Sequence, residues 1–434
     1  MLKFEKLDKD YNILKDYFEK SNIQFCDLSV GVRFIWRDDF KVEYAIYNDT
    51  LIIKESCRDY DNAFYYPCGK DEEGAIFEIE KYVKENNLDL KFCCIDNFHA
   101  SYLSGKYYMT EISNDRDWSD YIYDAESFKS FSGKKYSGQR NHINKFKKLY
   151  PNATVKIIEN ADIEKIKEFL TQFESENNLT AWSAISEDKR IREYLDNCFI
   201  LNQSGLAVYE NNKCIGISLG EVVKDTLIVH VEKALKEYEG VYSFLANEYA
   251  KAFANDKVKF INREEDCGDQ GLRISKLQYH PIEVKEKNIV RVKTLFDNIE
   301  KPIEFKTERL TVNDITEKDK EEYFNLYTDE ELNKFWGYDY REDLKEKPTK
   351  DYFYSFQKKL KEKKEEYSLA IRKENKMIGE LVYHNFDFDG GVEIGFRLLR
   401  KEQKKGYCFE SVSSLIKYAF EILKAKKIKG KCFR

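Results

Sequence analysis

The clearest pattern of hydrophobic and polar positions lies near the C-terminus, between Val392 and Leu423. Apolar residues first alternate with polar or small ones, which is the period of a half-buried β-strand: Val392, Ile394, Phe396 and Leu398. From Cys408 to Leu423 the apolar residues instead recur at helical spacing. The sequence therefore predicts a strand, a short polar turn and an amphipathic helix in direct succession.

The turn between this strand and this helix suits an anion. A strand that feeds a glycine-containing loop and then a helix directs several free backbone N–H groups to one point, and the helix dipole adds partial positive charge there. Gly406 lets a ligand approach the backbone closely. The alternative is a plain amphipathic strand–helix unit with solvated lysines. The predicted phosphate or pyrophosphate site comprises Gln403, Lys404, Lys405, Gly406, Tyr407 and Cys408.

This segment resembles the acetyl-coenzyme A loop of the GNAT N-acetyltransferase superfamily. The family pattern Gln/Arg-x-x-Gly-x-Gly/Ala maps onto Gln403, Gly406 and Cys408, and Cys408 departs from it. Glu393 to Phe396 before the loop and Glu410 after it are similar to the branch that acetylates N-terminal amines of ribosomal proteins.

The GNAT resemblance implies roles for the residues around the loop. The loop amides would hold the pyrophosphate of coenzyme A. The strand residues Ile394, Gly395 and Phe396 would pair with the pantetheine arm and offer an N–H to the thioester oxygen. Glu393 is the carboxylate expected to draw a proton from the acceptor amine, and a surface strand residue is the alternative interpretation.

Composition narrows the class of protein. A chain of 434 residues is long enough for several domains, and its net charge of −6 argues against a general nucleic-acid-binding or membrane-coating surface. The N-terminus shows no signal peptide, and no run of eighteen apolar residues predicts a transmembrane helix. The ten cysteines include no Cys-x-x-Cys pair, so we expect free thiols, no metal site and a cytoplasmic location.

The order of predicted elements indicates three modules, at residues 1–127, 128–286 and 303–434, with a linker at 287–302. The second and third modules share one order of elements: strand, helix, antiparallel strands, helix and strand. The expected fold class is α/β (α+β), in tandem GNAT-like acyltransferase modules. Each module would hold a mixed, mostly antiparallel sheet flanked by helices. The third module ends at Arg434, earlier than a complete GNAT domain, so we expect it to be C-terminally incomplete.

Residues 1–290 contain a second set of motifs. The most polar of them are His230 to Ala234, Glu239 to Tyr242 and Ile261 to Arg273, with Phe131 to Tyr136 upstream. Together they resemble a bacterial family similar to the soluble C-terminal domain of phosphatidylglycerol lysyltransferase. The resemblance implies two GNAT-like halves.

The acidic end of the predicted strand 258–262 is the candidate substrate site of the second module. Consecutive acidic groups there could hold a cationic amine, and the arginines could pair with those acids or with a carboxylate. The alternative is an internal salt-bridge network that fixes the turn. The candidate residues are Asn262, Arg263, Glu264, Glu265, Asp266 and Arg273. His230 is expected to be structural.

The segment from Phe128 to Leu149 contains seven basic residues and no acidic one. It could bind the phosphates of an RNA acceptor end, a lipid head group or a cofactor, and a solvated helix face is the alternative.

Three functions remain open from the sequence. The first is transfer of an acyl group, expected from acetyl-CoA, to a small-molecule or peptide amine through the third module. The second is aminoacyl transfer from an aminoacyl-tRNA through residues 1–286. The third is a GNAT-fold binding protein without turnover. The acceptor and the oligomeric state cannot be read from the sequence.

Overall fold

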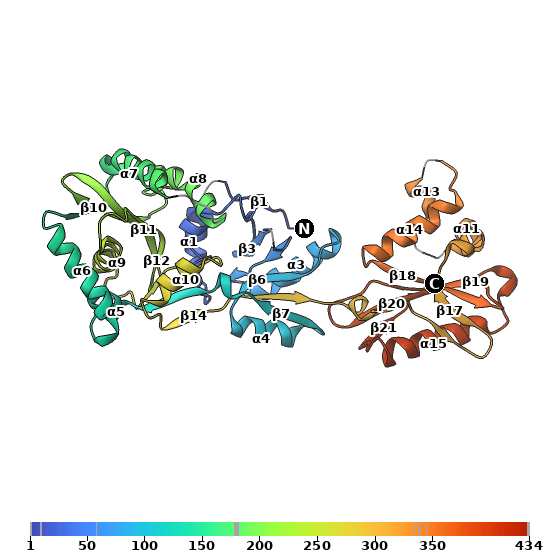
Figure 1. Ribbon diagram of the computed structural model, residues 1–434. Coiled ribbons are helices and arrows are strands. Elements are labelled where there is room, and N and C mark those ends of the chain that lie inside the picture. The colour runs from blue at the N-terminus through green and yellow to red at the C-terminus, as the bar shows by residue number, and fades with distance from the viewer. Residues whose placement is uncertain are drawn as a thin grey trace. The chain divides into compact units, whose positions relative to one another are not determined.

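The structure is a computed structural model that describes residues 2–8, 11–57, 59–177, 182–334, 336, 339–344 and 346–431. It divides into two compact units, and we treat each by itself. The N-terminal unit comprises Met1–Glu85, Lys91–Ala100 and Ile112–Val290. The C-terminal unit comprises Asn86–Leu90, Ser101–Glu111 and Arg291–Arg434. Figure 1 labels the elements.

The first sheet of the N-terminal unit has the strand order β1-β2-β3-β4-β6-β15-β7, with β5 paired to β3. Helices α1 and α2 pack into a core that also contains residues of the second sheet. The strands are β1 (Glu5–Lys6), β2 (Glu43–Tyr47), β3 (Thr50–Glu55), β4 (Ala63–Phe64), β5 (Cys68–Gly69), β6 (Lys91–Ile95), β7 (Thr110–Asn114) and β15 (Asn288–Val292), and the helices are α1 (Asn12–Phe18), α2 (Val30–Ile35), α3 (Glu72–Glu85) and α4 (Asn97–Lys106).

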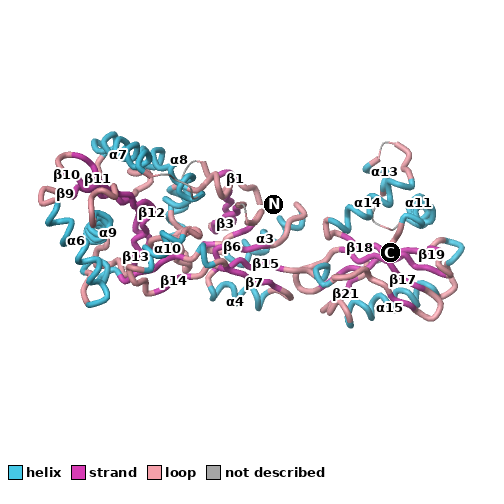
Figure 2. The backbone as a smooth tube through the Cα atoms, viewed as in Figure 1, coloured by secondary structure: helices cyan, strands magenta, loops and turns pink. Residues whose placement is uncertain are grey.

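The second sheet has the order β14-β8-β13-β12-β11-β10-β9. Alternate residues of β10 and β11 belong to two different cores, one with α7 and α8 and one with α9, so helices cover both faces (Figure 2). The strands are β8 (Asp120–Asp124), β9 (Thr154–Ile157), β10 (Ser204–Glu210), β11 (Lys213–Val223), β12 (Thr226–Ala234), β13 (Phe260–Asn262) and β14 (Glu283–Lys285), and the helices are α5 (Ala125–Ser130), α6 (Ser137–Leu149), α7 (Ile163–Glu176), α8 (Trp182–Asn197), α9 (Val241–Phe253) and α10 (Gln270–Leu277).

The C-terminal unit contains the third sheet, in the order β16-β17-β18-β19-β20-β21. Helix α15 packs on one face of this sheet, and α11 and α14 pack on the other (Figure 1). The strands are β16 (Phe305–Lys306), β17 (Thr311–Asp314), β18 (Glu366–Lys373), β19 (Lys376–His384), β20 (Gly391–Leu398) and β21 (Lys427–Lys429), and the helices are α11 (Lys320–Thr328), α12 (Glu330–Asn333), α13 (Tyr340–Asp343), α14 (Lys350–Glu362) and α15 (Tyr407–Glu421).

Each sheet contains a parallel pair of strands joined through a helix. These pairs are β4 and β6 through α3, β12 and β13 through α9, and β20 and β21 through α15. The other strand pairs of the second and third sheets are antiparallel. The predicted fold class, mixed and mostly antiparallel sheets flanked by helices, is confirmed.

The sequence also predicts a hairpin in the C-terminal unit, with strands Tyr367–Arg372 and Met377–Tyr383 joined by a turn at Lys373 to Lys376, and the structure confirms it. Strands β18 and β19 pair antiparallel up to Lys373 and Lys376. Glu374 and Asn375 between them have φ angles of 48° and 65°. A two-residue turn with both central residues at positive φ matches the twist of the flanking strands.

Two of the predicted module bounds differ from the sheets. Strand β8 lies before residue 127 but belongs to the second sheet, and β15 lies within the predicted linker 287–302 but belongs to the first. Both differences arise because strand pairing is non-local and charge obscures the periodicity of β15. The sequence also predicts a last strand at Ile428–Phe433. Strand β21 (Lys427–Lys429) covers its start, whereas Cys432 and Phe433 lie outside the described residues.

A buried ion pair fixes the start of the C-terminal unit. Arg372 on β18 donates to Asp319 through Nη1 and Nη2, at 2.5 and 2.7 Å. Asp319 also accepts from the backbone N–H and the hydroxyl of Thr316. Burial would raise the pKa of Asp319, but the hydrogen bonds from Arg372 and Thr316 hold this pKa below its usual value.

Replacement of this arginine, Arg372→Ala, should lower the free energy of unfolding of the C-terminal unit by about 3–5 kcal/mol, because it leaves a buried carboxylate unpaired. The control Lys376→Ala removes an ammonium that is 66% exposed and 3.6 Å from Glu322, and should change stability by less than about 0.5 kcal/mol.

Hydrogen exchange read by mass spectrometry on peptides of β17 and β18 measures both effects. Because the pKa of Asp319 is depressed, its contribution is present at neutral pH and is lost as the pH falls through that pKa. The difference between Arg372→Ala and the parent protein should therefore shrink in acid. An equal effect of both substitutions would contradict this account.

Candidate active site

The loop between β20 and α15 presents an uncapped helix N-terminus. Gly406 is the N-cap of α15, has a φ of 83° and contributes no side-chain cap. The first intrahelical bond runs from the N–H of Glu410 to the carbonyl of Gly406 at 3.1 Å. The amides of Tyr407, Cys408 and Phe409 therefore lack partners within the helix and point to one place.

Beside this loop, β20 has one edge that β21 covers only in part. The ladder between the two strands joins Gly391, Val392 and Glu393 to residues of β21 and ends there. On its other edge β20 stays paired with β19 as far as Leu398. Among the described residues, the edge from Ile394 to Leu398 that faces β21 has no strand partner, so its backbone groups can pair with an extended ligand.

A pocket of about 390 Å³ opens at this point. Six of the nine predicted cofactor residues line it; Ile394, Gly395 and Lys405 do not. Leu332, Trp336, Arg397 and Leu398 complete the wall. The pocket is therefore open to the helix N-terminus and to the end of the strand edge. The lining residues from the predicted set are Phe396, Gln403, Lys404, Gly406, Tyr407 and Cys408.

Arg309 and Glu410 hold this loop in place, and Arg309 is not among the site residues predicted from the sequence. The Arg309 guanidinium donates to Glu410 at 2.7 Å and to the carbonyl of Lys405 at 3.0 Å. It also lies 4.7 Å from the centre of the Tyr407 ring. A Cβ on Gly406 would lie 3.2 Å from Arg309 Nη2. Arg309 and Glu410 lie about a hundred residues apart in the sequence, so no local sequence pattern indicates their contact.

A buried polar group forms the floor of the pocket. Arg397 is 4% exposed and donates to Glu380 at 2.8 Å, and Tyr323 donates to the other oxygen of Glu380 at 2.8 Å. The Arg397 guanidinium also lies 3.9 Å from the centre of the Tyr327 ring and 4.2 Å from that of Trp336. This arrangement fixes the end of β20 against β19 and the helical face.

Glu393, the predicted base, lies at the opposite end of β20 from the pocket. It accepts from Asn385 Nδ2 at 3.0 Å and pairs with Lys431 at 3.1 Å. Burial would raise the pKa of Glu393, but these two partners bring that pKa below its usual value. A carboxylate with satisfied oxygens and a lowered pKa is a weak base, so the geometry gives Glu393 an electrostatic role more readily than proton abstraction.

The N-terminal unit repeats the loop geometry but closes it. Gly240 is the N-cap of α9, with a φ of 87° and no side-chain cap, as Gly406 is for α15. A Cβ on Gly240 would lie 2.3 Å from the carbonyl oxygen of His142 and 3.1 Å from Phe146, both on α6. The ring of Phe146 stacks on Phe244 at 4.6 Å. Helix α6 therefore fills the position that stays open beside Gly406.

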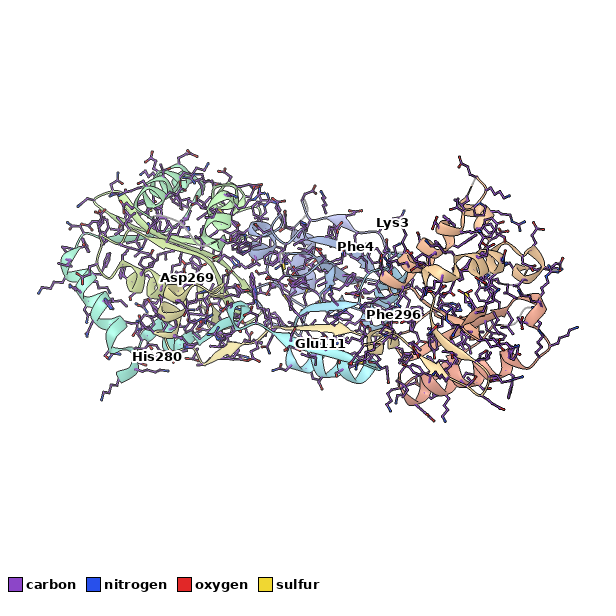
Figure 3. All side chains as sticks on the ribbon, turned by 45° about the vertical axis from the view of Figure 1, so that its right-hand side comes forward. Lys3, Phe4, Glu111, Asp269, His280 and Phe296 are labelled. Carbon is purple, nitrogen blue, oxygen red and sulfur yellow. The ribbon has the colours of Figure 1, made fainter. Side chains whose placement is uncertain are left out.

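The polar series after β13 forms an internal network. Asn262 donates to Asp120 at 2.7 Å, and Arg263 donates to Glu232 at 2.6 Å. Asp266 accepts from Arg273 Nε at 2.9 Å. Asp269 caps α10, and His280, after that helix, lies 2.8 Å from the carbonyl of Lys135; Figure 3 labels Asp269 and His280.

Glu264 completes this network through His230. The His230 ring has no exposed surface and lies between Glu264 at 2.6 Å and Glu221 at 3.1 Å. Burial alone would lower the pKa of His230, but the two carboxylates raise it to about 9. His230 is therefore a charged structural group. The contacts of Asn262, Arg263, Glu264, Asp266 and Arg273 favour the salt-bridge interpretation over the substrate site.

Glu265 is the exception, since it lines a cavity. It belongs to a buried group with Cys26, Asp27 and Asp120, whose ligand atoms are close enough to hold a cation. The ammonium of Lys287 lies among them, 2.5 Å from Asp27, 2.7 Å from Asp120 and in contact with Glu265. The chain itself thus supplies the positive charge that these groups require.

The cavity beside Glu265 has a volume of about 270 Å³. Its wall contains five carboxylates and one ammonium, with aromatic rings between them. Arg33, behind the wall, pairs with two of the carboxylates. Negative charge still exceeds positive charge, so the cavity suits a cation. The charged and aromatic lining residues are Asp27, Glu55, Asp59, Asp115, Glu265, Lys287, Phe40, Tyr60 and Trp118.

The basic segment 128–149 is largely the helix α6, and several of its cations serve the fold. Arg140 donates to the carbonyls of Phe131 and Gly133, and Lys145 pairs with Glu239. The solvated helix face is the interpretation these contacts favour.

Comparisons with known proteins agree with the two parts of the chain. Residues 19–290 match the family model "Phosphatidylglycerol lysyltransferase, C-terminal", and residues 309–434 match the model "Acetyltransferase (GNAT) domain". Because the first match covers well over half of the sequence, the chain belongs to the phosphatidylglycerol lysyltransferase C-terminal family. Both models describe acyl-transferring domains and support a GNAT-superfamily acyltransferase.

Three individual proteins illustrate the similarity. A conserved protein of unknown function from Bacteroides thetaiotaomicron has a TM-score of 0.63 at 25% identity, over 68% of this chain and 100% of its own. L-PGS from Bacillus licheniformis has a TM-score of 0.48 at 13% identity, over 65% and 91%. An uncharacterized protein from Mycoplasmoides gallisepticum is 25% identical over 178 residues, 40% of this chain; the chain spans 56% of that relative.

Among the described residues, no helix combines the length and the apolar character needed to cross a membrane.

The substitution Lys287→Met should destabilise the N-terminal unit by about 3–5 kcal/mol, because it removes the ammonium that three buried carboxylates share, and of these three only Asp27 keeps another cation among the described residues, Arg33. Burial and the neighbouring carboxylates already raise the pKa of Glu265 to about 7. Without Lys287 the carboxylates should protonate more readily, so the defect should be smaller at pH 5 than at pH 7.5.

Urea unfolding followed by tryptophan fluorescence measures this effect. The control Lys213→Met, at an exposed pair 3.3 Å from Glu237, should change little. A stability of Lys287→Met equal to that of the control at pH 7.5 would contradict the structural role of Lys287.

Proposed function

We propose that the C-terminal unit transfers an acyl group from an acyl-coenzyme A to an amine, with acetyl-CoA as the donor. The observation that carries this proposal is the open pocket where the uncapped N-terminus of α15 meets the edge of β20 that has no strand partner among the described residues. Amides at a helix N-terminus suit a pyrophosphate, and a free strand edge suits the amides of an extended arm.

The residues at the pocket fit such a donor. Gly406 leaves free the space that a Cβ would take beside Arg309. The N–H groups of Tyr407, Cys408 and Phe409 would hold the pyrophosphate, and Arg309 and Lys404 would add positive charge near it. The backbone of β20 from Ile394 to Leu398 would orient the arm, whose thioester supplies the acyl group.

The N-terminal unit favours a different role. Because α6 packs against Gly240, we expect no pyrophosphate at the corresponding position of the second sheet. The comparison between Gly240 and Gly406 therefore supports the C-terminal unit as the place for coenzyme A. One acyl-CoA per chain is the expected stoichiometry.

The substitution Gly406→Glu should abolish binding of acetyl-CoA, since it brings a negative charge and a strained left-handed side chain to the anion site. Gly138→Glu is the matched control, because Gly138 is exposed on α6 and open space surrounds it. Isothermal titration calorimetry should give at least a 100-fold weaker dissociation constant for Gly406→Glu and an unchanged one for Gly138→Glu. Equal binding by both variants would remove this loop from the site.

As a second function, we propose that the acidic cavity of the N-terminal unit binds an ammonium group, such as the side chain or α-amine of an amino acid. The excess of carboxylates and the rings of Phe40, Tyr60 and Trp118 support this proposal. Amino-acid amides carry this group without a competing carboxylate. An aminoacyl-tRNA as the source of the group stays a prediction from the sequence.

Lysine amide should raise the melting temperature of the protein, and norleucine amide, which keeps the α-amine but has an uncharged side chain, should raise it less, because only lysine amide adds a side-chain cation. Asp115→Asn should reduce the effect of lysine amide, since it removes one wall carboxylate at an exposed turn. Differential scanning fluorimetry reads both. If lysine amide has no effect at millimolar concentration, the cavity does not bind this class of ligand.

A further inference from the structure

Three titratable side chains form one row across the third sheet. His384 on β19 is the register partner of Glu366 on β18 and of Glu393 on β20. Residues directly opposite each other on paired strands point to the same face, with Cβ atoms about 5 Å apart. Of these three residues only Glu393 is predicted from the sequence as a site residue, because register across three strands is not visible in a local pattern.

This row lies on the face of the sheet opposite α15. Along β20, Val392 and Ile394 belong to the core that α15 covers. Glu393 alternates with them and therefore faces the side of α11 and α14. An acceptor that reaches the row would approach from the helical side, whereas the pyrophosphate site lies at the N-terminus of α15.

The row also lies beside the position that the acyl group of a bound acyl-coenzyme A would occupy. Consider a ligand that starts at the N-terminus of α15 and runs along the open edge of β20 from Leu398 towards Ile394. Among the described residues, the next residue of β20, Glu393, is already paired with β21, so the open edge stops there. Leu398 and Glu393 are five residues apart, or about 17 Å along a strand. The thioester of an extended arm would therefore come to rest beside Glu393, one strand away from His384.

Resting on the proposed function, we propose that His384 is the general base of the transfer, with Glu393 as the negative charge beside it and Glu366 as the group that receives its proton. The His384 side chain is 30% exposed, and its Nε2 lies 3.8 Å from Glu393 Oε1. Glu393 itself is held by Asn385 and Lys431 and is 7% exposed at its side chain. The histidine is thus the member of this pair that an amine can reach.

The reaction balances with these groups. The acceptor ammonium gives one proton to the free ring nitrogen of His384, which leaves a neutral amine. The amine nitrogen then forms a bond to the thioester carbonyl carbon, and the carbon–sulfur bond breaks. The second proton leaves the nitrogen for the departing thiolate, so the products are the amide and free coenzyme A. His384 returns its proton to water through Glu366.

The protonation states of the row suit this role. Burial lowers the pKa of His384 below its usual value, and Lys431 lowers it further against the opposing effect of Glu393. Burial and the nearby carboxylate of Glu380 raise the pKa of Glu366 to about 7, against Ser368 and Arg397. At neutral pH the imidazole is therefore uncharged, and Glu366 can both accept and release a proton.

The test measures thiol release from acetyl-CoA by the full chain, with peptides that carry free N-termini and with a polyamine as acceptors. His384→Gln should lower kcat about 100-fold and leave the dissociation constant of acetyl-CoA within twofold. The rise of kcat with pH should vanish in His384→Gln, and Glu366→Gln should shift its inflection. The control His142→Gln, at an exposed position of α6, should match the parent protein.

Two results would overturn the inference in distinguishable ways. If the parent protein transfers the acyl group and His384→Gln keeps its kcat and pH profile, His384 is not the base and the proposed function stands. If the parent protein releases no thiol with any of these amines, the proposed function itself fails, and the role of His384 fails with it.

Discussion

The candidate site depends on one constraint, the left-handed backbone at Gly406. This conformation turns the chain from β20 into α15 without a side-chain cap, so the first amides of the helix are left for a ligand. The Arg309–Glu410 ion pair fixes this turn to the first turn of α15. The Arg397–Glu380 ion pair fixes β20 to the neighbouring strand β19. These two ion pairs hold the N-terminus of α15, the edge of β20 and the pocket in fixed positions within the C-terminal unit.

The same turn occurs at Gly240, where the surrounding structure gives it a different use. There α6 places the carbonyl of His142 and the Cβ of Phe146 against the glycine. Charged groups of the same unit form a buried network around Lys287. The two units thus share a parallel strand pair with a glycine-capped helix, yet only one leaves that helix end accessible.

The sequence predicted the elements that have a local signal. The strand, loop and helix around Gly406 follow from periodicity and a single glycine, and the hairpin at Glu374 and Asn375 follows from turn chemistry. The closure of Gly240 by α6 and the row of Glu366, His384 and Glu393 depend on long-range packing or register. The residues that form each of these features are too far apart in the chain for a local sequence pattern to reveal them.

The consecutive acidic residues after β13 show a second limit of prediction from the sequence. A cluster of opposite charges is compatible with a substrate site and with an internal network, and only the partners decide. Arg263 and Asp266 are satisfied within the fold, whereas Glu265 reaches a cavity. Neighbouring residues in the chain therefore serve different purposes because successive side chains leave a turn in different directions.

Hydrogen exchange with and without acetyl-CoA tests the central claim most directly, because it reads the amides themselves. The account predicts slower exchange in peptides that cover residues 398–412 and no change in peptides that cover 235–246. Protection at 235–246, or none at 398–412 in a protein that binds the ligand, would contradict it.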